Sequence, residues 1–93
     1  MEIFVPGNYL IVNSTYSGQS VMKDSKIVKT IYDDELVRVI NIVEHIKESL
    51  IRGQLDTLDW ISLKNMDNGH IWAKPVNSNH VIFLLFTYKN TIN

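Results

Sequence analysis

The sequence contains no cysteine, which excludes disulfide bonds, thiolate zinc sites and cysteine nucleophiles together. It has only two prolines and four glycines. The glycines are isolated, so no phosphate-binding loop can be assembled from them. A small chain without disulfides is typical of a reducing compartment. The sequence therefore predicts a cytoplasmic protein.

The chain also has no excess of positive or negative charge. Charged residues make up 20% of the chain and the net charge is -1, which leaves no electrostatic footprint for nucleic acid or an anionic membrane. The longest apolar run, residues 81–86, is far shorter than the roughly 20 residues that a membrane-spanning helix needs. The first residues lack the basic and long apolar segments of a signal peptide. We therefore expect neither nucleic-acid binding nor direct membrane insertion.

The length of 93 residues and the hydrophobic content of 45% predict a single domain over residues 1–93. A domain of this size buries only roughly 60% of the surface that its unfolded chain exposes, so its core is modest. Near the start, residues 9–12 and 20–23 favour strands around a polar turn at residues 13–18. Residues 27–31 either extend the second strand or connect it to the next element.

Residues 33–52 carry the pattern of one long helix. Asp33, Asp34 and Glu35 would place negative charge at the positive end of its dipole, and Gly53 suits a left-handed C-terminal cap. The apolar positions form one broad stripe: Leu36, Val39, Ile40, Val43, Ile46, Leu50 and Ile51. This stripe is wider than the arc of about 100° that a helix on a sheet requires. Either the helix has a second contact beside the sheet, or it is deeply set with irregular edges.

Two alternating segments meet at the turn sequence Asp67-Asn68-Gly69, which predicts a tight hairpin. Ile61 and Leu63 would face one side of it, and Trp60 the other. Trp60 and Trp72 can therefore lie on one face as a cross-strand pair. Such a pair is explained either by ordinary packing or by an interface anchor, because tryptophan is enriched in binding hot spots.

Residues 81–86 (VIFLLF) show no alternation, which is typical of a strand covered on both faces; a buried helix is the rival interpretation. The predicted fold is α+β, a five-stranded antiparallel sheet in the order β-β-α-β-β-β with one long helix on one face. Since one helix covers only one face, we expect a partner chain to cover the other.

Side chains for chemistry do not converge in the sequence. His45, His70 and His80 are scattered, and none has a partner at metal-ligand spacing. The acidic residues at 33–35 are explained by helix capping. We therefore predict no catalytic residue, no cofactor and no metal, and a protein that is not an enzyme.

The order of elements resembles the roadblock family of dynein light chains and Ragulator-type scaffold subunits. Residues 9–25 are similar to the family's first hairpin, residues 33–50 to its central helix, and residues 58–90 to its last three strands. The chain would be a minimal version that lacks the family's first and last helices. The resemblance implies dimers that join through the third strand, here residues 59–66, and the central helix. It also implies scaffolding of small GTPases or motor complexes, with recruitment to membranes or motors through partners.

Three functional hypotheses follow. The first is a non-enzymatic, dimer-forming scaffold or regulatory subunit, homo- or heterodimeric with a second roadblock-like chain and bound to a small GTPase or a larger complex. The second is a small phage or bacterial protein that inhibits a partner by binding through its sheet or helix surface. The third is a small-molecule-binding or enzymatic α+β domain. The predicted interface residues are Leu36, Ile40, Val43, Trp60, Ile61, Leu63 and Trp72.

Overall fold

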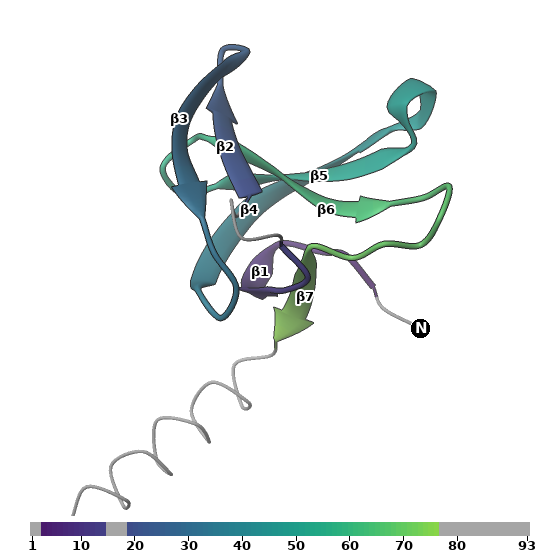
Figure 1. Cartoon of the computed structure of the whole chain (residues 1–93), viewed down its shortest axis with the longest axis horizontal. Helices are drawn as coiled ribbons and strands as arrows, with labels where there is room; N and C mark the ends of the chain where they lie inside the picture. Colours follow the sequence, from purple (N-terminus) through teal and green to yellow (C-terminus); the bar gives the residue numbers. More distant parts are fainter. Residues whose placement is uncertain (1–2, 15–18, 77–93) are drawn as a thin grey trace, which may run out of the picture.

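The computed structural model describes residues 3–14 and 19–76, which form seven strands and one short 3₁₀ helix (Figure 1). The predicted strand at residues 81–86 lies outside the described residues. The elements are β1 (Gly7–Ile11), β2 (Gln19–Lys23), β3 (Lys26–Ile31), β4 (Leu36–His45), η1 (Ile46–Glu48), β5 (Leu50–Leu55), β6 (Trp60–Asn65) and β7 (Ala73–Val76).

All seven strands belong to one antiparallel sheet in the order β3-β2-β6-β5-β4-β1-β7. The sheet curls on itself. The Trp72 N–H donates to the Leu63 carbonyl at 2.8 Å, and the Val12 N–H donates to the Trp72 carbonyl at 2.9 Å. The segment just before β7 therefore links β6 to β1 and closes a ring of strands. The hairpin β2–β3 extends beyond this ring and joins β6 at the pair Met22–Trp60.

The predicted α+β class, with one long helix over residues 33–52, is wrong. That segment forms the hairpin of β4 and β5, and its only helical turn is η1 at the tip. Valine and isoleucine dominate it, and β-branched side chains favour strands over helices. The helix-like spacing arises from a bulge between Val39 and Asn41. Val39 faces Leu55 and Ile42 faces Gly53, so two core-side residues lie three apart.

The residues expected to cap the helix have other roles. Asp34 adopts a left-handed φ of 72° in the turn between β3 and β4. The Asp33 carboxylate accepts a hydrogen bond from the Ser14 N–H at 2.8 Å. Gly53 lies buried inside β5, where an added Cβ would come within 3.0 Å of Val39 and 3.1 Å of Leu63. Gly53 is therefore required by close packing rather than by a helix end.

The predicted strands near the start of the chain are confirmed as β1 and β2, but they do not form a hairpin. β1 pairs with β4 and β7, whereas β2 pairs with β3 and β6. Residues 27–31 belong to the separate strand β3. The expected edge for dimerisation, residues 59–66, is also not an edge, because β6 is paired on both sides. The element order that carried the roadblock resemblance is thus absent.

The chain reverses at residues 67–69 as predicted, but the Asn65 N–H bonds to the His70 carbonyl at 2.8 Å, so the turn is longer than a tight hairpin, and β7 pairs with β1 rather than with β6. Gly69 has a left-handed φ of 77°, and its N–H donates to the Asn65 carbonyl at 2.9 Å. The Asn65 side chain also accepts the Asp67 N–H at 2.9 Å. The turn reverses the chain, so that residues 71–72 bond back to β6. It thereby sets the position of Trp72.

The core lies inside the ring, under the base of the β2–β3 hairpin. Its buried apolar residues are Tyr9, Ile11, Val21, Ile31, Val39, Ile51, Leu55, Ile61, Leu63 and Ala73. Tyr9 is the one member with a polar group, and its hydroxyl donates to the Val5 carbonyl at 2.7 Å. Within residues 3–14 and 19–76 there is no helix long and apolar enough to cross a membrane.

Candidate functional site

Strands β5 and β6 have two faces of different character. Ile51, Gly53 and Leu55 point to the core, and Arg52 and Gln54 point away from it. On β6 the core residues Ile61 and Leu63 alternate in the same way with Trp60 and Ser62. The register pairs Gln54 with Trp60 and Arg52 with Ser62. The outer face of the sheet therefore carries a half-buried cluster of large and polar side chains.

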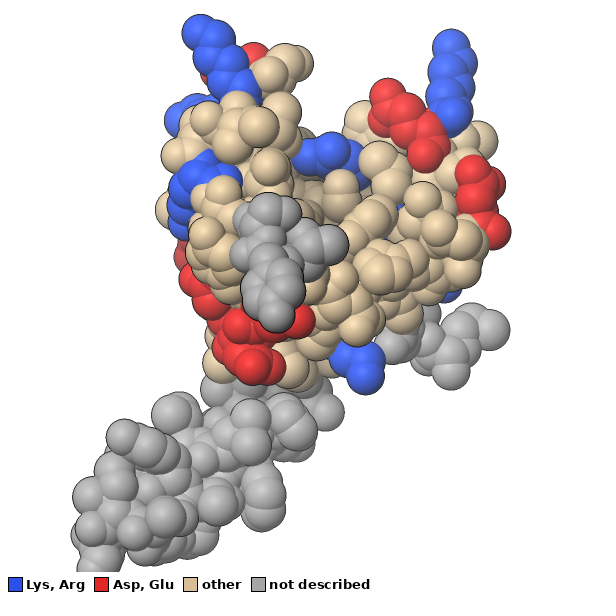
Figure 2. Space-filling view, viewed as in Figure 1, with Lys and Arg blue, Asp and Glu red and all other residues tan. Residues whose placement is uncertain are grey.

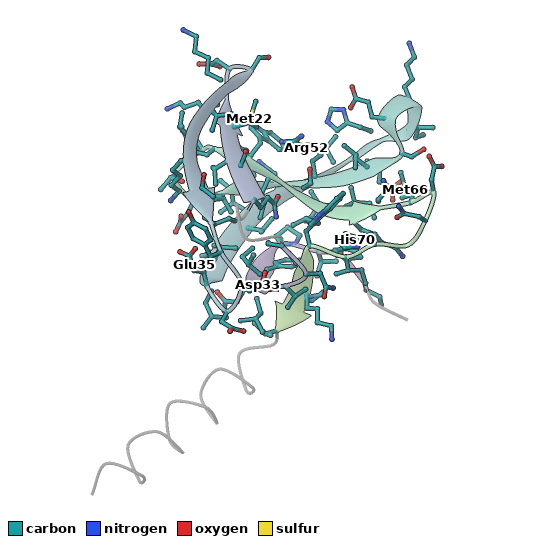
Figure 3. All side chains as sticks on the ribbon, in the orientation of Figure 1. Met22, Asp33, Glu35, Arg52, Met66 and His70 are labelled. Carbon is teal, nitrogen blue, oxygen red and sulfur yellow. The ribbon has the colours of Figure 1, made fainter. Side chains whose placement is uncertain are left out.

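Two hairpins rise on either side of this outer face, β2–β3 and β4–β5 (Figure 1). The space-filling view shows them as two raised arms with a valley between them and basic atoms at its floor (Figure 2). Met22 of β2 and Arg52 of β5 both lie in the space between the arms (Figure 3).

The first hollow in this valley, about 370 Å³ in volume, lies between the hairpin tips. Its floor is formed by Met22, Arg52 and Trp60. Its walls carry polar and charged residues of the two arms: Asp24 and Ser25 from one, His45 and Glu48 from the other.

The second hollow, about 520 Å³, continues from the first toward the turn at 67–69. Met22 and Arg52 line both hollows, so the two form one continuous surface, which we call the groove. The other lining residues of the second hollow are Asn13, Ser14, Gln19, Ser20, Ser62, His70 and Trp72. Each hollow thus contains one tryptophan, and Arg52 lies between them.

Backbone and side-chain bonds hold the second hollow in shape. The Gln19 side-chain carbonyl accepts the Ser62 N–H at 2.7 Å, which fixes the start of β2 against β6. His70 packs edge-on against Trp72, with ring centroids 5.0 Å apart. Because the backbone of Trp72 is bonded to both β6 and β1, its ring is carried by rigid strands.

Two polar groups near this hollow lack partners in the part of the chain that the structure describes. They are the Gln19 Nε2 amide and the Ser14 hydroxyl, both buried. Among the same residues, the one contact at ion-pair distance joins His45 Nδ1 and Glu48 Oε2 at 3.3 Å, and Arg52 takes part in none. The half-buried residue Arg52 therefore brings to the groove a guanidinium without a carboxylate partner among the described residues.

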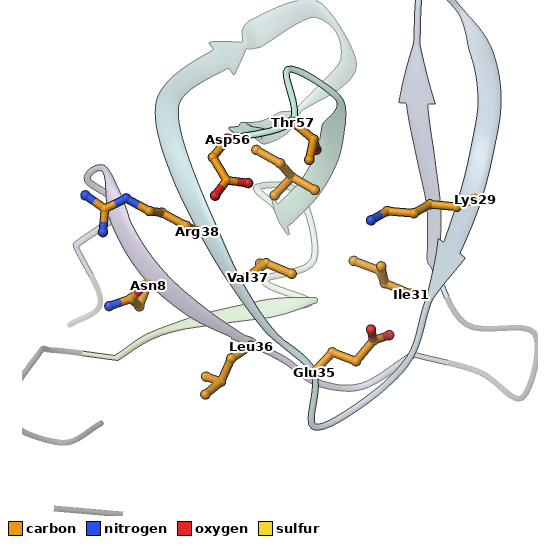
Figure 4. Close-up of a pocket in the computed structure, with 10 residues that line it drawn as sticks. Asn8, Lys29, Ile31, Glu35, Leu36, Val37, Arg38, Asp56 and Thr57 are labelled. Carbon is orange, nitrogen blue, oxygen red and sulfur yellow. The ribbon is translucent and has the colours of Figure 1, made fainter. Parts of the chain in front are cut away.

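A separate hollow of about 410 Å³ lies where β3 meets β4 (Figure 4). Lys29, Glu35 and Asp56 point toward it from three sides. Arg38 lies at its margin, so charges of both signs are mixed along the wall. This mixture selects no single class of ligand, and the groove is the better candidate site.

The predicted interface residues are distributed over three environments. Trp60 and Trp72 line the groove. Leu36 lies at the mixed-charge hollow, half-buried Ile40 at the bulge, and Val43 is 39% exposed on β4. Ile61 and Leu63 are fully buried in the core, so their side chains are not available to a partner.

Sequence reasoning missed Met22, Arg52 and Gln19 as site residues. Arg52 is the last residue of the helix predicted over residues 33–52, and the strand predicted at residues 20–23 pairs with β3 and β6 instead of with residues 9–12. The alternation of β6 was the one available signal, because it placed Trp60 and Ser62 on the same face.

The described residues contain no group of three or more histidine or acidic side chains able to hold a metal. Burial raises the pKa of Tyr9, and its hydrogen bond to the Val5 carbonyl opposes that rise. Tyr9 belongs to the core, not to the groove. No protein-family model, curated protein or solved structure matches this chain.

Proposed function

We propose that this chain is a non-enzymatic protein-binding module that holds a segment of a partner protein in the groove. One observation carries the proposal: Trp60, Trp72, Met22 and Arg52 form one continuous hollowed surface on the outer face of the sheet. Tryptophan and arginine are the residues most enriched in binding hot spots, and methionine is enriched at interfaces.

The placement of the tryptophans supports this function. Both are half-buried rather than fully buried, and both sit on strands or on backbone bonded to strands. A hollow lets a partner side chain lose its hydration on several sides at once, which a flat surface does not. The groove therefore suits an inserted segment, with the two hairpins as its sides.

Of the functions expected from the sequence, binding through the sheet surface is retained, whereas dimerisation and GTPase or motor scaffolding are not. Binding through the sheet surface was the mode expected for a small inhibitor of another protein. Dimerisation through residues 59–66 and a central helix is not proposed, since β6 is an internal strand and the helix is absent. GTPase and motor scaffolding rested on that architecture and is not proposed either.

Selection from a random peptide library displayed on phage tests the proposal. The purified full-length chain is the bait, and Trp60→Ala and Trp72→Ala are the counter-baits. We expect enriched peptides to lose at least about tenfold in affinity on each counter-bait, since a hot-spot truncation costs roughly 2 kcal/mol or more. Val43→Ala is the matched control, because Val43 is exposed on the same sheet but lines neither hollow.

Two results would contradict this function. One is a set of enriched peptides that bind both tryptophan variants as tightly as the wild-type chain. The other is a groove already occupied by a second copy, seen as a stable dimer by light scattering that Trp60→Ala converts to monomer. Circular dichroism of each variant separates lost binding from lost folding.

A further inference from the structure

We propose that the Trp72 end of the groove is an anion subsite that receives a carboxylate of the bound partner segment, with the guanidinium N–H groups of Arg52 as its donors. This inference rests on the proposed function and adds the chemistry that would select the segment.

The charges along the groove are unequal at its two ends. The hollow at Trp60 has two carboxylates on its walls, Asp24 and Glu48. No carboxylate of the described residues lines the hollow at Trp72, where the ionisable lining residues are Arg52 and His70; the nearby Asp33 carboxylate is engaged by the Ser14 N–H. Arg52 lines both hollows, and lysines at 23, 26 and 47 flank the two carboxylates at the hairpin tips, where basic side chains project from both arms (Figure 2). The lining of the Trp72 hollow is thus the one in which no carboxylate competes with a bound anion for Arg52.

The hydrogen-bonding groups at the Trp72 end also favour a negatively charged ligand. The acceptor of the Gln19 side chain is already engaged by the Ser62 N–H, and its amide nitrogen is fully buried. The donors that a ligand can reach are therefore those of Arg52. The guanidinium of Arg52 can bind both oxygens of a carboxylate at once.

The rest of this hollow favours a carboxylate joined to an apolar group. Trp72 supplies an aromatic wall, held edge-on by His70. Met22 supplies a polarizable side chain next to Arg52. An acidic side chain or a chain terminus beside an aliphatic residue would satisfy the donors and cover this wall together.

The same donors could hold a phosphate of single-stranded nucleic acid, whose bases also stack on aromatic rings. The groove has one arginine, and the carboxylates of Asp24 and Glu48 at its other end would repel the next phosphate. A nucleic-acid strand carries a charge at every step, whereas a peptide can carry a single one. The charge pattern thus favours a peptide.

The experiment is an NMR titration of the ¹⁵N-labelled full-length chain with small probes at pH 7. The indole N–H signals of Trp60 and Trp72 are assigned with phenylalanine variants and report the two ends separately. The first probe is N-acetyl-leucine, which has a terminal carboxylate, and its neutral control is N-acetyl-leucinamide. A leucyl-glutamate dipeptide, acetylated and amidated at its ends, carries the carboxylate on a side chain instead.

We expect the acid to bind at least tenfold more tightly than its amide and to shift the Trp72 indole more than that of Trp60. Arg52→Gln should remove this preference. Lys74→Gln is the matched control, since it removes the same charge from an exposed position on β7. The two carboxylate probes then show whether a terminal or a side-chain carboxylate fits better, and a preference for either supports the subsite.

Equal affinity for acid and amide would overturn the subsite, as would an acid preference that survives Arg52→Gln. Tighter binding of a thymidine oligonucleotide or inorganic phosphate than of either carboxylate probe would overturn it too. These failures are distinct from failure of the proposed function. Peptides that require both tryptophans, contain no enriched acidic residue and bind equally well with a free or an amidated C-terminus would preserve protein binding and refute the anion subsite.

Discussion

The two faces of strands β5 and β6 are built from alternating residues of the same chain segments, yet they differ in kind. The core face is aliphatic, with Ile61 and Leu63 fully buried and Gly53 making room for Leu63 and Val39. The outer face carries Trp60 and Arg52, which remain half-buried. Partly covered side chains keep apolar surface that a partner can still bury. One face thus maintains the fold, and the other keeps part of its side chains accessible.

The sharpest test of this division uses two neighbouring residues of β6. Ile61→Lys should unfold the protein, because it places an unpaired charge in the core at a cost of about 4 kcal/mol or more. Ser62→Lys should leave it folded, since this side chain points to the groove. Urea unfolding followed by circular dichroism measures both. A folded Ile61→Lys chain with wild-type stability would contradict the difference between the core face and the outer face.

A second test concerns the close approach behind Gly53. Gly53→Ala should destabilise by about 1–3 kcal/mol, because the new methyl group would press on Val39 and Leu63 at 3.0–3.2 Å. The measurement is the free energy of unfolding in urea. Gln54→Ala, on the outer face of the same strand, is the control.

The same contact predicts coupling between the two strands. Leu63→Ala alone should cost roughly 2–5 kcal/mol. Combined with Gly53→Ala it should cost less than the sum of the two, since the truncated side chain leaves space for the new methyl group. Strict additivity would show that Gly53 is not in contact with Leu63.

The smallest expected effect concerns the polar group in the core. Tyr9→Phe removes the hydrogen bond to the Val5 carbonyl and should cost about 1 kcal/mol at neutral pH. Burial raises the pKa of Tyr9 in the folded chain above its ordinary value of 10.0. The unfolded chain therefore loses this proton first as pH rises, so the stability linked to Tyr9 is complete below pH 10 and decreases above it.

Unfolding in urea between pH 8 and pH 11 measures this alkaline loss. It should be smaller in Tyr9→Phe than in the wild-type chain. Tyr32→Phe, at a residue that is 52% exposed, is the control and should keep the wild-type profile. If Tyr9→Phe lost as much stability at alkaline pH as the wild-type chain, a group other than Tyr9 would be responsible for that loss.

Local chemistry made some features predictable. The turn at 67–69 followed from Asn68-Gly69, because few other residues adopt the left-handed conformation of Gly69. The strand β6 and its two faces followed from strict alternation. The candidate site was predicted only in part: Trp60 and Trp72 were among the predicted interface residues, but the residues that join them were not.

The prediction of a helix over residues 33–52 failed for a physical reason. The bulge at Val39–Asn41 shifts the phase of β4, so its apolar residues repeat at intervals that also suit a helix. Periodicity cannot separate these two structures when a strand is bulged. The abundance of valine and isoleucine was the available counter-signal.

The sequence by itself determined the turn at 67–69, the alternation of β6 and the short strands β1 and β2, because each depends on neighbouring residues. Only the tertiary structure decided that β4 and β5 are strands, since their hairpin is extended into a sheet by β6 on one side and by the distant strand β1 on the other. It also decided the site. Met22, Arg52, Trp60 and Trp72 become one surface because β2 joins β6 and the segment before β7 folds back onto it. These contacts between segments distant in sequence form only when the ring of strands closes. No local sequence pattern predicts that closure.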